Sequence, residues 1–331
     1  MSICYITGYG KKVRAENGVI AITSPPGEGE RSEKVVVTPA DLSLVVIAGD
    51  HGLTTSALRL LLEQGTEFVL LDRYGRPAGY LLPGRKSPVI ENAERQRNLP
   101  AKKALAVARA IVKQAIHNKF SLVRSMIRNS SGKLSPAAVA LQDFERQVDV
   151  TRSVASLLGV EGSATREYYL ALRQLIPASF GFTGRTRHPP RDPVNSLFSY
   201  GYGILYAVIR TALVRVNLSP FYGVLHADYK NQEALVYDFI EEFRQPLVDR
   251  VVLTMINRHQ IDMHNFTISR EGCLIRPEFR KVFAEAVLER LDARYEFYGQ
   301  PQPFSAVIDR QAELLADALL NGSPYLPFEY R

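Results

Sequence analysis

The hydrophobic period changes once along this chain, from the spacing of short strands to the spacing of long helices. In residues 1–82, short runs with many β-branched residues are separated by Gly and Pro, and Asn17-Gly18 joins two of them, a strong hairpin signal. After residue 100 the apolar residues recur at helical spacing. We therefore predict an α+β protein with two domains, a small β-sandwich-like domain over 1–90 and a larger all-α-helical domain over 91–331, with a linker at about 83–100.

The boundaries of single elements follow from the same patterns. One helix in the first domain can be capped by Thr54 or Thr55 and stops at Gly65. The strands expected there cover residues 2–7, 12–14, 19–23, 34–37, 44–47, 67–71 and 78–82. The helices expected in the second domain cover residues 101–128, 137–158, 163–176, 194–217, 231–258, 277–294 and 304–320.

Composition narrows the class of protein. The chain has only two cysteines, Cys4 and Cys273, so neither a disulfide framework nor a CxxC zinc site is available. Its start lacks the pattern of a signal peptide, and its best apolar stretch is interrupted by Arg210 and Arg215. We expect a soluble cytoplasmic protein with no membrane association.

Positive charge is concentrated in one part of the chain. The net charge is +7, but residues 85–133 alone hold twelve Lys or Arg against two acids. Such a segment suits a nucleic acid, although a solvated basic helix face remains an alternative. The loop 181–193 is also basic and could either grip phosphates or connect helices. The residues expected to contact DNA are Arg109, Lys113, Arg124, Arg128, Arg185, Arg187, Arg191, Lys230 and Arg244.

Acidic residues gather on one face of the segment 231–258. Asp238 and Glu241, three residues apart, are neighbours on a helix, and a bound cation would relieve their repulsion. Acidic helix faces are common, however, and by itself the pattern favours a solvated stripe. Pro246 lies inside the segment and should kink it, because proline cannot donate a helical hydrogen bond to Glu242. The face comprises Asp238, Glu241, Glu242, Gln245 and Asp249.

Two further residues could complete a metal site. His226 stands in a break between helices, where an imidazole can point into a cleft or serve a structural role. Glu167 lies on a helix that is apolar over much of its surface, so it needs a metal or an arginine partner such as Arg166. Two carboxylates and one imidazole form a ligand set for a divalent ion.

Three stretches resemble the CRISPR-associated endonuclease/integrase family that inserts new spacers. They are SATREYYLALRQLI, the GVLH turn that ends at His226, and LVYDFIEEFRQPLVDR. GLTTSALRLLLEQGTEFVLLDRYGRPAGYL resembles the family's sheet domain, ERQRN its linker and SPYLPF its tail. The chain departs from the family pattern at Val216-Asn217 and Ala234, which are not candidate ligands. The resemblance implies that Glu167, His226 and Glu241 bind the metal and that Asp238 assists them in the catalytic centre.

The resemblance also implies a reaction and partners. Mg²⁺ or Mn²⁺ would polarise a phosphate, and a DNA 3′-hydroxyl would join a spacer to a CRISPR repeat by transesterification. The expected partners are double-stranded DNA (spacer precursor and CRISPR repeat), a second copy in a homodimer and a small ferredoxin-like CRISPR-associated adaptation subunit. Two alternatives remain at this point, a metal-dependent repair nuclease for branched DNA and a non-catalytic DNA-binding scaffold.

Overall fold

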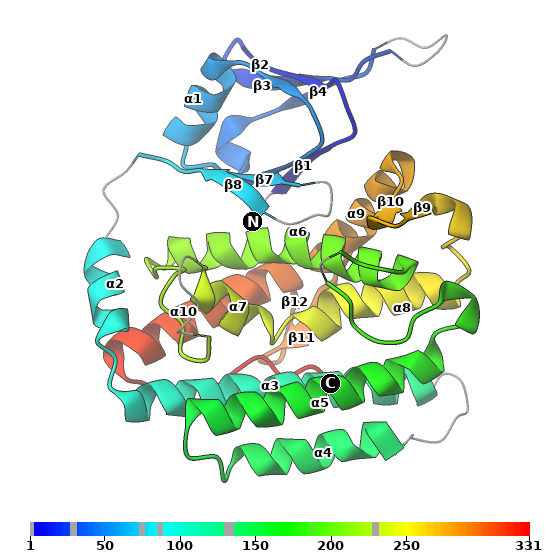
Figure 1. Cartoon of the computed structure of the whole chain (residues 1–331). Helices are drawn as coiled ribbons and strands as arrows, with labels where there is room; N and C mark the ends of the chain where they lie inside the picture. The colour runs from blue at the N-terminus through cyan, green and yellow to red at the C-terminus, as the bar shows by residue number, and fades with distance from the viewer. Residues whose placement is uncertain are drawn as a thin grey trace.

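The chain folds into a β-rich part that sits on a larger helical part (Figure 1). In this computed structural model the β-rich part ends with the strand Pro77–Leu81, and helices follow from Val89. The predicted order, a β-rich domain before a helical one, is confirmed. The structure describes residues 3–26, 32–72, 77–84, 89–128, 136–187, 189–226 and 232–331.

Two four-stranded sheets form the N-terminal part. The hairpin between β2 and β3 turns through Asn17 and Gly18, which have φ angles of 49° and 81°, as the Asn-Gly signal predicts. The helix α1 (Thr55–Glu63) packs with the sheets and is capped by the Thr54 side chain, which accepts from the Ala57 amide. In spatial order the first sheet is β1 (Ile3–Thr7), β5 (Leu44–Ala48), β7 (Glu67–Leu71) and β8 (Pro77–Leu81), and the second is β4 (Lys34–Val37), β3 (Val19–Thr23), β2 (Lys12–Glu16) and β6 (Gly52–Leu53).

The strand β5 connects the two parts of the molecule. All five of its residues are buried, and successive side chains point to opposite faces of the sheet. Val45 and Ile47 pack into the core enclosed by the two sheets and α1, whereas Leu44, Val46 and Ala48 pack into the core of the helical part. The first sheet is therefore covered on both faces, which explains why its strand reads as a continuous apolar run.

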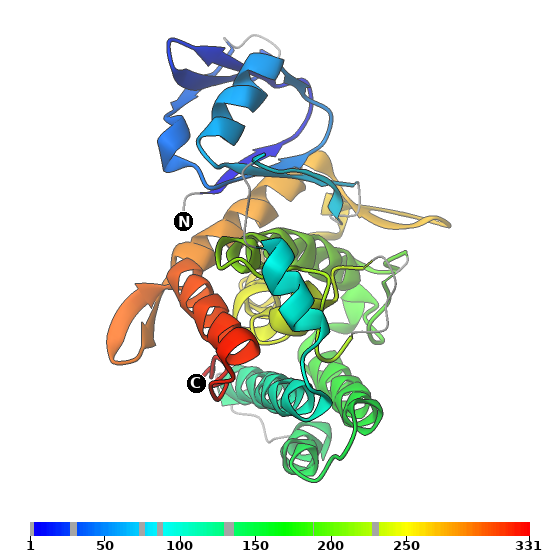
Figure 2. The ribbon, with the colours of Figure 1, turned by 90° about the vertical axis from the view of Figure 1, so that its left-hand side faces the viewer.

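The helical part is built from long helices with two hairpins between them (Figure 2). The expectation of an all-α-helical domain is corrected by the hairpins β9–β10 (Phe266–Ser269, Gly272–Ile275) and β11–β12 (Arg294–Phe297, Gln300–Pro303). The expected linker is also corrected, because part of it forms the helix α2. The helices of this part are α2 (Val89–Arg97), α3 (Ala101–Arg128), α4 (Pro136–Val148), α5 (Val154–Leu175), α6 (Pro193–Arg215), α7 (Ala234–Ile240), α8 (Arg250–Asn257), α9 (Pro277–Asp292) and α10 (Phe304–Asn321).

Three predicted helices have different boundaries in the structure, and the one predicted over 163–176 is α5, which begins earlier, at Val154. The helix predicted over 137–158 is wrong, because α4 ends at Val148 and Ser153 starts α5 with a capping box. The helix predicted over 231–258 is divided into α7, a π-helix over Arg244–Asp249, and α8. Pro246 lies within the π-helix, where the missing amide proton breaks the regular hydrogen-bond ladder.

The helix α6 lies at the centre of the fold, beneath the N-terminal sheets (Figure 1). By length and composition it could cross a membrane, but 83% of its most apolar window is buried inside the protein. It is therefore the core helix of the helical part, and its apolar residues serve packing.

A candidate catalytic centre around Glu161, His226 and Glu241

The acidic face of the segment 231–258 is buried. Relative exposure is 0% for Asp238, 6% for Glu241, 0% for Glu242, 1% for Gln245 and 0% for Asp249. A solvated acidic stripe is therefore wrong for this chain. Because a buried carboxylate needs hydrogen bonds or a positive partner, each of the four carboxylates must have one.

Asp238 holds the turn that presents His226. Its carboxylate accepts backbone amide protons from Val224 at 2.6 Å, Leu225 at 2.9 Å and His226 at 3.1 Å. A Cβ at Gly223 would lie 2.6 Å from Asp238 Oδ2, so only glycine allows this close approach. The carboxylate therefore shapes the whole turn as well as contacting the imidazole.

The imidazole of His226 is oriented by the same carboxylate. Its Nδ1 lies 2.7 Å from Asp238 Oδ1, which makes Nε2 the nitrogen that can serve as a ligand or proton acceptor. Burial opposes the charged form, but the hydrogen bond and charge of Asp238, together with the charges of Glu241 and Glu161, outweigh burial and raise the pKa of His226. His226 thus lies within the field of three carboxylates.

A buried lysine lies between two of these carboxylates. Lys119 Nζ, on α3, is 3.7 Å from Glu161 Oε1 on α5 and 3.6 Å from Glu241 Oε2. The lysine side chain is 3% exposed, and its nitrogen has no hydrogen-bond partner among the described residues. Burial alone would raise the pKa of Glu241, but Arg244, Lys119 and His226 hold it below its ordinary value. This centre is therefore built to hold a positive charge between Glu161 and Glu241.

Glu167 does not join this centre in the structure. Its side chain is 22% exposed, and Arg166 Nε lies 3.9 Å from its Oε1, the arginine partner considered as the alternative. Glu161 is six residues earlier on α5, a separation that rotates a side chain by about 240° and shifts it by about 9 Å on a helix. The two glutamates therefore face different directions, and the structure brings Glu161 to His226 and Glu241. The sequence signal that could have indicated Glu161 is its position as a lone carboxylate between Gly159 and Gly162 in an otherwise apolar stretch.

The ligand chemistry of the centre suits a hard divalent ion, although the side chains do not form a ready cluster. Among the described residues, no three His, Cys, Asp or Glu side chains are grouped closely enough to hold a metal. Two carboxylates and one imidazole are nevertheless donors that Mg²⁺ and Mn²⁺ accept. The Lys119 ammonium, which is ion-paired with Glu161 and Glu241 but makes no hydrogen bond among the described residues, shows that a positive charge fits between these two carboxylates.

On the side of the π-helix, a network of polar and aromatic side chains packs against the centre. Arg244 pairs with Glu241, and its guanidinium lies 5.0 Å from the centre of the Tyr202 ring. Tyr202 and Tyr168 each donate a hydrogen bond of 2.5 Å to Asp249. Burial raises the pKa of Asp249 to about 6, although both tyrosines oppose this shift. Arg244 is thus directed toward Glu241 by an aromatic and carboxylate network.

A cavity of about 820 Å³ opens beside Arg244, between the N-terminal sheet and the helical part. Arginine and tyrosine side chains dominate its polar lining, and they come from β8, the loop before α6, the helices α6 and α7, and the π-helix. Arg187 belongs to this lining and also influences the charge of Glu241. The arginines and tyrosines of the lining are Arg185, Arg187, Arg210, Arg244, Tyr80, Tyr202, Tyr206 and Tyr237.

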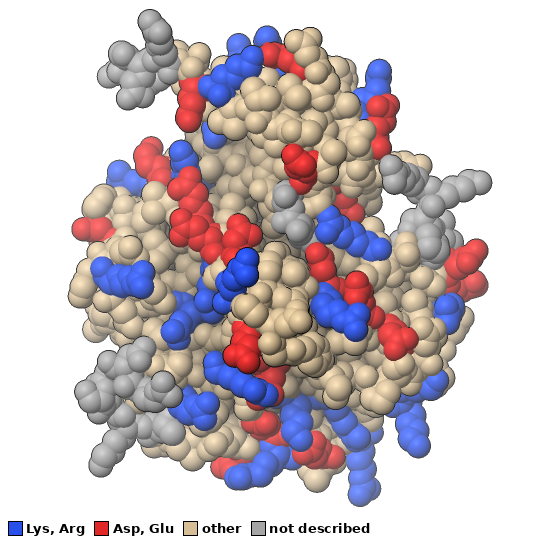
Figure 3. All heavy atoms as spheres, turned by 180° about the vertical axis from the view of Figure 1, so that it is seen from behind, with Lys and Arg blue, Asp and Glu red and all other residues tan. Residues whose placement is uncertain are grey.

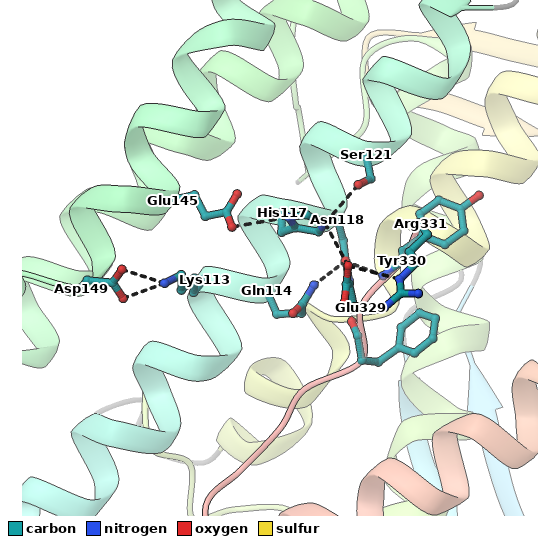
Figure 4. A network of polar contacts seen from close by, with 11 residues as sticks. Lys113, Gln114, His117, Asn118, Ser121, Glu145, Asp149, Glu329, Tyr330 and Arg331 are labelled. Atoms are coloured by element: carbon teal, nitrogen blue, oxygen red, sulfur yellow. Dashed lines mark hydrogen bonds and ion pairs between the residues drawn. The ribbon is translucent and has the colours of Figure 1, made fainter. Parts of the chain in front are cut away.

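The basic residues of α3 face a neighbouring helix. Lys113 Nζ lies 2.7 Å from Asp149, Arg109 Nε donates to Thr151 at 3.3 Å, and His117 contacts Glu145 (Figure 4). Exposed Arg124 lies over the ring of Phe120 at 5.6 Å. Basic and acidic side chains are interspersed over the face of the molecule in Figure 3. Two of the α3 residues expected to contact DNA, Arg109 and Lys113, therefore contact the turn that follows α4, whereas Arg124 is exposed.

The remaining candidates for DNA contact differ in accessibility. Arg185 donates to Asn195 at 2.9 Å and to Ser199 at 3.0 Å, so it braces the start of α6. Arg191 donates to the Arg270 carbonyl at 3.1 Å, and Arg187 is exposed at the cavity. Lys230 and the side chain of Arg128 lie outside the described residues.

The family model described as CRISPR associated protein Cas1 matches residues 4–289. This chain belongs to the Cas1 family. The resemblance seen in the sequence is confirmed. A CRISPR-associated endonuclease Cas1 from Methanospirillum hungatei is 39% identical over 332 residues and covers 100% of both chains. One from Archaeoglobus fulgidus is 28% identical over 326 residues, 92% of each chain.

Solved structures agree with this membership of the Cas1 family. A casposase bound to integration product has a TM-score of 0.89 at 20% identity, covering 100% of this chain and 95% of that one. A Cas1 protein from Thermotoga maritima has a TM-score of 0.80 at 21% identity, covering 100% of both. A chain of a Cas6-RT-Cas1–Cas2 complex has a TM-score of 0.82 at 25% identity, covering 100% of this chain and 36% of that one. The first two likenesses show the fold.

Proposed function

We propose that this Cas1-family enzyme is a metal-dependent DNA endonuclease and integrase of CRISPR adaptation. The observation that carries the proposal is that Glu161 and Glu241, from separate segments, lie on either side of the buried Lys119 ammonium, and that the charges of both carboxylates act on His226. Its curated relatives are named endonucleases, and its structural neighbours include a casposase bound to integration product. This combination supports phosphodiester chemistry on DNA over a non-catalytic scaffold.

Glu161, His226 and Glu241 would hold one Mg²⁺ or Mn²⁺ ion. When bound, such an ion offsets charge on the scissile phosphate and on the leaving oxygen. Asp238 keeps the His226 imidazole in one orientation through Nδ1, and Arg244 restrains the Glu241 carboxylate. Lys119 balances the two carboxylates from α3 and adds a fixed positive charge beside the phosphate.

The DNA strand end would lie in the cavity beside Arg244. Single-stranded ends bind well to aromatic faces that stack with bases and to arginines that contact phosphates. Tyr237 supplies such a face, and exposed Arg187 supplies a phosphate contact next to the centre. The bound 3′-hydroxyl would then lose its proton and attack the repeat phosphorus, forming a P–O bond to the spacer. The P–O bond to the 3′-oxygen of the cut repeat strand would break at the same time, and that oxygen would leave as a 3′-hydroxyl after taking up a proton.

The proposed partners are inferred from similar proteins and not from a surface of this chain. The structural neighbour in complex with Cas2 supports a small adaptation subunit as partner, and we propose a homodimer of this chain with double-stranded spacer precursor and CRISPR repeat as substrates. The complex would act in the cytoplasm.

Substitutions of three glutamates test the assignment of the ligands, and two of these glutamates, Glu161 and Glu167, lie on the same helix. Glu161→Gln and Glu241→Ala should each lower strand joining with Mn²⁺ by about 10³-fold, because a metal-bound phosphate loses its fixed position. Glu167→Gln is the matched control on α5 and should retain at least about half of the activity of the unchanged protein. Strand joining is measured with a labelled spacer end and a plasmid bearing a repeat. Full activity in Glu161→Gln together with loss in Glu167→Gln would reverse the assignment.

A further inference from the structure

The last residues of the chain return to the catalytic centre from behind. The helix α10 (Phe304–Asn321) is capped at its C-terminal end by Gly322, which has a left-handed φ of 82°. Residues 323–331 follow without regular secondary structure. We call these residues the tail. Phe328 is 0% exposed, and Tyr325 and Tyr330 are also buried, so three aromatic side chains anchor the tail in the fold while the residues between them reach the surface. Its end lies beside α3 (Figure 1).

Aromatic packing fixes the tail beneath the segment that carries Glu241. The Phe328 ring is stacked on Phe243 with centroids 5.4 Å apart and an angle of 11° between the planes. Tyr295 and Phe304 also contact Phe328, with centroid distances of 5.3 Å and 5.9 Å. Because Phe243 is two residues from Glu241, this stack determines how that part of the chain sits.

A side-chain amide on α3 repairs the break in the helix caused by Pro246. Proline has no amide proton, so the Glu242 carbonyl lacks the helical donor four residues later. Asn118 Nδ2 donates to the Glu242 carbonyl at 2.9 Å and to the Phe328 carbonyl at 3.0 Å. The Tyr330 amide donates to Asn118 Oδ1 at 2.9 Å (Figure 4). The tail and the broken helix therefore share the Asn118 amide group.

The Glu242 side chain is tied to the tail as well. Its carboxyl accepts the Tyr325 hydroxyl at 2.6 Å and the Phe328 amide at 2.8 Å. The main chain and the side chain of Glu242 are therefore both held by Asn118 and the tail. Leu326, between these contacts, points outward and is 65% exposed.

We infer that the tail is a positioning element of the catalytic centre, an inference that rests on the proposed function. Glu242 is adjacent to Glu241, and Asn118 is adjacent to Lys119. By joining Glu242 to Asn118, the tail fixes the separation at which the Glu241 carboxylate faces the Lys119 ammonium. A displacement of about 1 Å at such a centre is enough to reduce a rate about 10²-fold.

Two substitutions that keep the tail in the chain test this inference. Tyr325→Phe removes one hydroxyl and keeps the ring, and Asn118→Ala removes the shared amide. Both should lower the rate constant of strand joining by about tenfold or more, with the KM for DNA changed by less than about twofold. Both should also raise hydrogen exchange at amides 240–250 selectively. Leu326→Ala is the control in the same segment and should change neither quantity.

The outcomes separate the inference from the proposed function. Lower melting temperatures with unchanged exchange at 240–250 and an unchanged rate per folded molecule would reduce the tail to ordinary core packing and overturn the inference. If the unchanged protein fails to join strands, the proposed function is wrong. In that case hydrogen exchange at amides 240–250 in Tyr325→Phe and Asn118→Ala still decides whether the tail positions this segment.

Discussion

At the scale of single residues, the chain buries carboxyl groups in two different electrostatic states. Glu241 is surrounded by Arg244, Lys119 and His226, which keep its pKa below its ordinary value despite burial. Glu242, the next residue, has only neutral hydrogen-bond donors, and burial raises its pKa to about 8. Adjacent positions on one segment therefore differ in charge because one side faces the cationic centre and the other faces the tail.

The raised pKa of Glu242 predicts a specific dependence of stability on pH. The folded state binds a proton more tightly than the unfolded chain, so the free energy of unfolding falls as pH rises from about 4.5 to about 8. The slope from this residue is at most about 1.4 kcal/mol per pH unit. Urea unfolding at pH 5, 6.5 and 8 should show this loss in the unchanged protein relative to Glu242→Gln. Parallel stability profiles for the two proteins would contradict the assignment.

At the scale of elements, a buried ion pair connects the N-terminal sheet with the start of α7. Arg210 on α6 lies 2.7 Å from Glu233 and 3.3 Å from Glu67, and its guanidinium is 4.1 Å from the centre of the Tyr80 ring. Tyr80 and Tyr206 donate to Glu233 at 3.0 Å and 2.8 Å. Because Glu233 directly precedes α7, this network sets the start of the helix that carries Asp238.

Two arginines on α6 allow a matched test of this network. Arg210→Met leaves two buried carboxylates without a cation and should lower the free energy of unfolding by about 3–5 kcal/mol. Arg215→Met breaks a half-exposed pair with Asp309 and should cost about 0–1 kcal/mol. Chemical denaturation at neutral pH measures both. Equal losses in the two variants would show that the network adds no special stability.

At the scale of the whole molecule, the position of the positive charge matters more than its amount. The chain carries a net charge of +7, yet Lys113 on the basic segment is neutralised by Asp149. Arg187 is exposed and lines the cavity beside the catalytic centre, so it can exchange counterions for a DNA phosphate. The accessible charge for DNA is therefore expected at the junction of the β-rich and helical parts.

Salt dependence of DNA binding distinguishes these two positions. Arg187→Ala should weaken binding and reduce the slope of log K against log salt by about 0.7–0.9, the value for one phosphate contact. Lys113→Ala should leave the slope unchanged, because its partner is Asp149. Binding isotherms at several salt concentrations with a forked DNA provide the measurement. A reduced slope only in Lys113→Ala would return the DNA track to α3.

Local sequence patterns determined much of this protein without help from the fold. The bounds of α3, the Asn17-Gly18 turn, the Thr54 cap and the disruption at Pro246 each depend on a few neighbouring residues, so local propensity was sufficient. The resemblance also singled out His226, Asp238 and Glu241, and in the structure Asp238 contacts His226 while the charge of Glu241 acts on it. Helical periodicity does not say which face of a helix meets a distant segment.

Tertiary packing alone decided which glutamate of α5 reaches the centre and whether the acidic face of the segment 231–258 meets water. Either Glu161 or Glu167 of α5 could serve as the ligand by sequence alone. Glu161 reaches the centre because α3, which carries Lys119, and the end of α7, which is followed by Glu241, approach that side of α5. Glu242 is buried because residues 323–331 fold back over it from more than eighty positions away. Such contacts depend on long-range chain geometry, which no local spacing of residues encodes.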